Sequence, residues 1–87
     1  MIKFILLYCC ERDLHVLGCF DNISDARNLM KEDFLKALKD ENIEIDAYFE
    51  KDVENFDFCS DNAGIEKDLA WFNGGSNYDW KIEEVKI

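Results

Sequence analysis

Two apolar stretches near the start of the chain are separated by a short polar break. Residues 2–9 are nearly all apolar and rich in β-forming side chains, a pattern typical of a strand buried on both faces. Residues 11–13 are charged, and the apolar pattern then resumes over residues 14–20. Because the break is so short, the pattern predicts an antiparallel hairpin.

Residues 23–41 carry the pattern of an amphipathic helix. Either Asn22 or Ser24 can accept a hydrogen bond from the free amides of the first turn. Glu32 and Lys36 are spaced for an ion pair between successive turns. We expect the helix to lie across the sheet on an apolar stripe made of Ala26, Leu29, Met30, Phe34, Ala37 and Leu38.

The segment 43–58 fits two periodicities. Its first apolar residues alternate, which is typical of a strand, whereas apolar residues spaced by three and four along the same segment are typical of a helix. We favour a short helix over residues 46–56. Its outer face would carry Glu50, Glu54 and Asp57, with few basic residues nearby to neutralise them.

The last third of the chain predicts a turn at residues 60–64 and then a second hairpin. Residues 66–73 would pair with residues 78–86 around a Gly-rich turn at 74–77. A symmetric register would bring three favourable pairs onto one face: Trp71 with Trp80, Leu69 with Ile82, and Lys67 with Glu84. The expected fold class is therefore α+β, in one domain over residues 1–87: a small antiparallel sheet in ββα(α)ββ order, with one main amphipathic helix packed on one face.

The chain supplies more apolar side chains than one helix can cover. Hydrophobic residues make up 48% of the sequence, and both faces of the first predicted strand are apolar. The second face of the sheet needs a cover because a large exposed apolar patch is rare in a monomer. Three covers are open: the segment 43–58, a partner protein, or a second copy of the chain.

The negative charge of the protein is concentrated in the middle of the chain. The formal net charge is −10, and residues 40–68 contain eleven of the twenty acidic residues but only two of the ten basic ones. Such a field repels nucleic acid and anionic membranes, and it attracts basic protein surfaces or cationic ligands. We therefore expect a basic protein partner, such as a nucleic-acid-binding nuclease, that meets Glu44, Asp46, Glu50, Asp52, Glu54, Asp57 and Asp61, with Tyr48 and Phe56 as aromatic anchors.

Candidate catalytic and metal-binding groups are sparse. The only histidine is His15, and Cys10 is the one cysteine placed to face it across the first hairpin. Cys9, Cys10 and Cys19 do not have the spacing of a zinc site, and adjacent residues of a strand point to opposite faces. We expect the four cysteines to be reduced. We also expect the protein to have no enzymatic activity and to bind no metal or cofactor. The alternative functions are a homo-oligomer that holds a ligand between sheet faces, and a zinc- or thiol-dependent small protein.

The pattern of the whole chain resembles a loose class of very small proteins from phages and mobile elements of AT-rich bacteria. The resemblance depends on the opening Met-Ile-Lys-Phe-Ile-Leu-Leu-Tyr strand, the lead into the helix at 18–21, and the closing strands around 70–73 and 79–82. Some similar acidic proteins are anti-CRISPR inhibitors, which bind a Cas effector and occupy the basic groove meant for nucleic acid. The resemblance implies an inhibitor of that kind and assigns no site residues.

The start of the chain and its longest apolar runs bear on location. One lysine precedes a short apolar run, and neither the length nor the small-residue cleavage site of a signal peptide follows. No run approaches the roughly 20 apolar residues of a membrane span. We expect a cytoplasmic protein, in a bacterium or an infected host.

Overall fold

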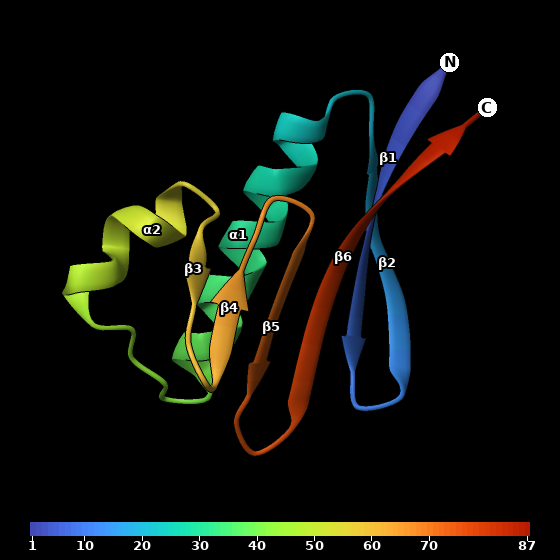
Figure 1. The fold of residues 1–87 in the computed structure, drawn as a ribbon. Coiled ribbons are helices and arrows are strands. Elements are labelled where there is room, and N and C mark those ends of the chain that lie inside the picture. The colour runs from blue at the N-terminus through green and yellow to red at the C-terminus, as the bar shows by residue number, and fades with distance from the viewer.

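The computed structural model describes residues 1–87 as a six-stranded antiparallel sheet with two helices (Figure 1). The strands lie in the order β2-β1-β6-β5-β4-β3, and the long helix α1 crosses one face of the sheet. The predicted α+β class is confirmed. The elements, in chain order, are β1 (Ile2–Cys10), β2 (Asp13–Phe20), α1 (Ile23–Asp40), the 3₁₀ turn η1 (Ala47–Phe49), α2 (Glu50–Glu54), β3 (Phe58–Cys59), β4 (Ala63–Ile65), β5 (Leu69–Asn73) and β6 (Asn77–Lys86).

The first two strands form the predicted hairpin. A two-residue turn joins them, and its first residue, Glu11, has a positive φ of 59°. The backbone amide of Glu11 also donates to the carbonyl of Asn77 at 2.9 Å, which ties this turn to the start of β6. Because β1 lies between β2 and β6 in the sheet, both of its edges are paired. The strand is not buried on both faces as predicted, because only Leu6 is fully buried and most of its other residues are half-buried.

Helix α1 begins where the sequence predicts. The Asn22 side chain accepts from the backbone amide of Asp25 at 2.9 Å, so Asn22 and not Ser24 is the N-cap. The helix buries its stripe in the core cluster of the sheet, at Ala26, Met30, Phe34 and Leu38. The predicted Glu32–Lys36 ion pair does not form. The only two ion pairs in the molecule are Lys3–Asp21 and Lys81–Asp68.

The register of the last hairpin differs from the prediction by one residue. Asn73 pairs with Asn77, Ala70 with Trp80, and Leu69 with Lys81, so the expected pairs of Trp71 with Trp80, Leu69 with Ile82 and Lys67 with Glu84 are wrong. A shift of one residue turns every side chain of a strand to the other face. The observed register places Phe72 and Trp80 in the core under α1, and it leaves Trp71 half-buried on the opposite face, against Gly64.

The segment 43–58 is partly helical, as favoured, but its helix is shorter than predicted. Instead of one helix over 46–56, a 3₁₀ turn leads into the five residues of α2. The predicted turn at 60–64 is likewise shorter, because Ala63 and Gly64 belong to β4. Strands β3 and β4, which were not predicted, extend the sheet beyond β5.

The second face of the sheet remains uncovered. Val53 of α2 belongs to the same core cluster as Phe34 and Leu38 of α1, so the segment 43–58 packs on the side of the sheet that α1 covers (Figure 1). The first of the three proposed covers is therefore wrong. On the open face, Leu14 and Val16 of the edge strand β2 have 65% and 66% of their surface exposed.

A half-buried tyrosine holds the end of α1 to the sheet and gives the protein a predicted sensitivity to alkali. The hydroxyl of Tyr78 donates to Glu41 at 2.6 Å. This hydrogen bond, together with burial, raises the pKa of Tyr78 above its ordinary value of 10.0. The fold thus favours the neutral phenol. The contribution of Tyr78 to the free energy of unfolding is therefore complete below pH 10 and declines as the pH rises beyond it.

We therefore expect the stability difference between the wild type and Tyr78→Phe to shrink as the pH rises above 10. Urea unfolding followed by circular dichroism, from pH 8 to above pH 10, measures it. The phenylalanine variant keeps the ring against Phe72 and corrects for the titration of lysines, which both proteins share. A difference that stays constant over this range would contradict the assigned hydrogen bond.

Candidate functional site

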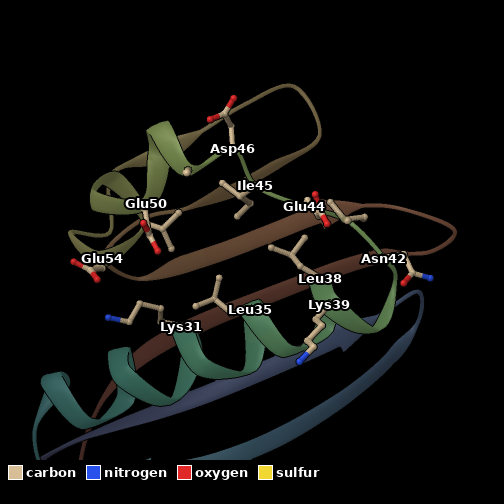
Figure 2. A pocket seen from close by; sticks show the side chains of 13 residues that line it. Lys31, Leu35, Leu38, Lys39, Asn42, Glu44, Ile45, Asp46, Glu50 and Glu54 are labelled. Carbon is tan, nitrogen blue, oxygen red and sulfur yellow. The ribbon is translucent and has the colours of Figure 1, made fainter.

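The main hollow of the molecule lies between α1 and the segment 42–54 (Figure 2). We call it the α1–α2 groove. Its volume is about 520 Å³. Six apolar side chains line its floor: Leu35, Leu38, Ile43, Ile45, Ala47 and Val53. Asp46, Glu50 and Glu54 lie on one side of the groove and Lys31 and Lys39 on the other, while Glu44 and Asn42 lie on the connection that follows α1 (Figure 2).

The end of α1 sets the far limit of the groove. Asn42 has a positive φ of 58°, its amide donates to the carbonyl of Lys39 at 3.0 Å, and the amide of Ile43 donates to that of Leu38 at 2.9 Å. This is the Schellman arrangement, which ends a helix and reverses the chain. Ile43 packs against the core cluster that contains Leu38, and both residues line the groove floor.

The wall of the groove opposite α1 is formed by η1 and α2, which begin at a helix cap and end at a second Schellman turn. The carboxylate of Asp46 accepts from the amide of Tyr48 at 2.9 Å and so starts η1. After α2, Phe56 has a φ of 55°, and the amide of Asp57 donates to the carbonyl of Asp52 at 2.8 Å. Helix α2 is therefore held to five residues, and its Glu50 and Glu54 lie on one side, one turn apart.

Four of the predicted partner-binding residues are brought together by this geometry. Glu44, Asp46, Glu50 and Glu54 are all exposed and all line the α1–α2 groove. Glu50 and Glu54 were expected on the outer face of their helix, but they lie along the edge that faces α1 (Figure 2). The four come from an extended stretch and a short helix, so their convergence depends on the reversal of the chain at residue 42.

The other five predicted residues lie outside the groove. Asp52 is half-buried, while Asp57 and Asp61 are exposed. Tyr48 is 82% exposed, and its ring and that of Phe49 meet edge to face at a centroid distance of 5.1 Å, so Tyr48 is available as an anchor. Phe56 is half-buried against the core, so less of its ring is open to a partner than the ring of Tyr48.

The carboxylates of the groove form no ion pair with a basic side chain. Neither ion pair of the molecule includes Glu44, Asp46, Glu50 or Glu54. The ammonium group of Lys31 lies 5.2 Å from the centre of the Phe56 ring, where it makes a cation–π contact at the end of α2. Like charges one turn apart, such as Glu50 and Glu54, repel each other by a few tenths of a kcal/mol, so this edge is a local source of negative potential.

Sequence reasoning missed the floor of the groove. Leu35 lies beside the predicted apolar stripe of α1 and is 42% exposed, which is unusual for a leucine on a helix with one covered face. A signal was present, because Lys31, Leu35, Leu38 and Asn42 follow one another at spacings of four, three and four residues. Residues at that spacing lie on one side of a helix, next to the predicted apolar stripe.

The candidate thiol and metal residues are dispersed. All four cysteines are free, and no group of three or more His, Cys, Asp or Glu side chains is placed to hold a metal ion. The ring of His15 stacks against Tyr8 at a centroid distance of 6.1 Å. Burial, followed by the neighbouring Cys10 thiol, raises the pKa of Tyr8 to about 12. None of the helices is both long and apolar enough to cross a membrane.

Comparison of the chain with known protein families, with characterised proteins and with solved structures gives no match. The site is therefore interpreted from its own residues.

Proposed function

We propose that this protein is a non-enzymatic binding module that docks its acidic edge onto a basic protein surface. One observation supports this most: four exposed carboxylates, on Glu44, Asp46, Glu50 and Glu54, line one groove and have no basic side chain within ion-pair distance. Carboxylates along one edge that have no basic side chain as an ion-pair partner repel one another in the free protein. A cationic partner removes that repulsion when it binds.

Charge and apolar surface have separate roles in this proposal. The negative edge speeds the encounter with a positive surface and disfavours partners of the same sign. Affinity then depends on apolar contact, which the groove floor and the exposed ring of Tyr48 supply.

The partner that we favour is the nucleic-acid-binding surface of a nuclease. Such surfaces present lysine and arginine side chains to phosphates, and carboxylates on a rigid scaffold can take the place of phosphates. A Cas effector is the specific candidate, and it follows from the resemblance of the chain to small acidic anti-CRISPR proteins. On this proposal the protein inhibits by occupying the site of the nucleic acid, without cleaving or modifying anything.

A competition assay tests the proposal. Purified protein is added to a panel of Cas nucleases with labelled target DNA, and both DNA binding and cleavage are measured across ionic strength. We expect loss of DNA binding by at least one nuclease, reversed by excess DNA and weakened steeply between about 50 and 200 mM salt. Inhibition that persists unchanged in high salt, or inhibition without loss of DNA binding, would contradict the proposal.

A second candidate function is favoured by a different observation. The open face of the sheet exposes Leu14 and Val16, as expected of a small homo-oligomer that holds a ligand between two sheets. Sedimentation velocity separates the candidates. A stable dimer that carries a co-purifying ligand would support the second, and a monomer would remove it.

A further inference from the structure

We propose that the α1–α2 groove receives an amphipathic basic helix from the partner. This inference rests on the proposed function, because it names the part of the partner that the acidic edge meets. It goes beyond that function by adding a shape and an apolar requirement to a requirement for positive charge.

The floor of the groove is the first reason. A surface that only replaced phosphates would need carboxylates and no apolar hollow. Here six apolar side chains line a space of about 520 Å³, and Leu35 remains 42% exposed within it. The volume lies in the range of about 300–1,000 Å³ that is typical of ligand sites.

The elements that form the groove favour a helix over an extended segment. Lys31, Leu35 and Leu38 follow α1 at i, i+4 and i+7, which is two helical turns. A helix laid alongside presents its own apolar residues at the same intervals. An extended peptide would bind by pairing with the edge of a sheet, but none of the residues that line the groove belongs to a strand.

The charges around the groove give the bound helix an orientation. Acidic side chains lie along the 44–54 wall, and Lys31 and Lys39 lie along the α1 wall (Figure 2). A complementary helix carries lysine or arginine on the flank of its apolar stripe that meets the acidic wall. Its opposite flank, which meets Lys31 and Lys39, is neutral or acidic. This arrangement distinguishes the groove from an unspecific negative surface.

Two labelled peptides of about five helical turns provide the test. Both contain the same leucines, lysines and alanines. In one the leucines form a single helical stripe, and in the other the order is scrambled so that no stripe exists. We expect the striped peptide to bind at least about tenfold more tightly by fluorescence anisotropy, and to gain helical circular dichroism on binding.

Matched variants locate the site. Leu35→Gln removes an exposed leucine from the groove floor, and Leu14→Gln removes one from the open sheet face. We expect Leu35→Gln to weaken the striped peptide by about fivefold or more, and Leu14→Gln to leave it unchanged. Because both side chains are exposed, both variants are expected to fold, which circular dichroism checks.

The outcomes separate this inference from the proposed function. Equal, salt-sensitive binding of both peptides, with no effect of Leu35→Gln, would overturn the helix-in-groove inference and leave the charge-based function standing. Loss of striped-peptide binding in Leu14→Gln alone would also overturn the inference, because the open sheet face would then be the binding surface. If neither peptide binds at low salt, the inference is overturned together with its charge-based premise.

Discussion

Replacing Trp80 with alanine is expected to destabilise the protein by about 3–5 kcal/mol. A domain of this size has a total stability of about 4–13 kcal/mol, so the substitution removes a large part of that stability, and near the lower end of the range it leaves the variant largely unfolded. Trp80 is the largest of the fully buried side chains, and its loss therefore removes more of the core than the loss of any other residue.

The position of Trp80 explains the size of the effect. Its side chain is 1% exposed, and its ring meets Phe34 of α1 edge-on at 5.7 Å between centroids, while Phe72 stacks on it at 5.9 Å. Its indole Nε1 also donates to the carboxylate of Asp33 at 2.8 Å. Alanine would therefore leave a large cavity and would also remove the donor from a half-buried carboxylate.

Trp71 provides a control of the same residue type on the neighbouring strand. Because the observed register places it half-buried on the open face, Trp71→Ala is expected to cost only about 1–2 kcal/mol. Urea unfolding followed by far-ultraviolet circular dichroism compares the two variants without using tryptophan fluorescence. Equal losses at the two positions would contradict the register and the assignment of the faces.

Reversing three charges on the acidic wall is expected to give the largest functional effect. We expect Glu44→Lys, Glu50→Lys and Glu54→Lys together to weaken binding of the leucine–lysine peptides by about 100-fold at low ionic strength. The loss corresponds to roughly 1 kcal/mol for each removed charge contact. The stability of the fold should change by less than about 1 kcal/mol, because the three side chains are exposed and take part in no ion pair.

A second triple variant separates position from total charge. Asp13→Lys, Glu83→Lys and Glu84→Lys change the net charge by the same amount, but all three residues are exposed and lie on β2 and β6, outside the groove. We expect this variant to lose much less affinity, and both triple variants to bind alike in high salt, where exposed charges are screened. Equal losses at low salt would mean that only the net charge matters.

Local signals made the helix and the first hairpin predictable. Asn22, one of the two caps that the sequence offered, caps α1, and the apolar spacing of the helix matches its buried face. The register of the last hairpin was not predictable in this way. Residues 73–77 are small or polar and fit a three-residue loop as well as a four-residue loop, so core packing around Trp80 decides between the two. Strands β3 and β4 are only two and three residues long, too short to leave a periodic signal.

The acidic character of the site was predictable, but its shape was not. The excess of carboxylates in residues 40–68 is a property of the sequence. Their convergence depends on Asn42, whose left-handed conformation ends α1 and reverses the chain, and a second left-handed residue, Phe56, ends α2. Asparagine is a common residue at such a position, but phenylalanine is not. The groove floor forms only where α1 and the segment 42–54 lie side by side, so the sequence alone did not predict it.

Amide chemical-shift mapping of the ¹⁵N-labelled protein with the striped peptide tests most directly whether the α1–α2 groove is the binding surface. We predict that the largest shifts occur at Leu35, Ile45, Glu50 and Val53, and that they decrease as salt is added. Shifts confined to β1 and β2, around Val16, would contradict the account, because the open sheet face and not the acidic groove would then bind the partner.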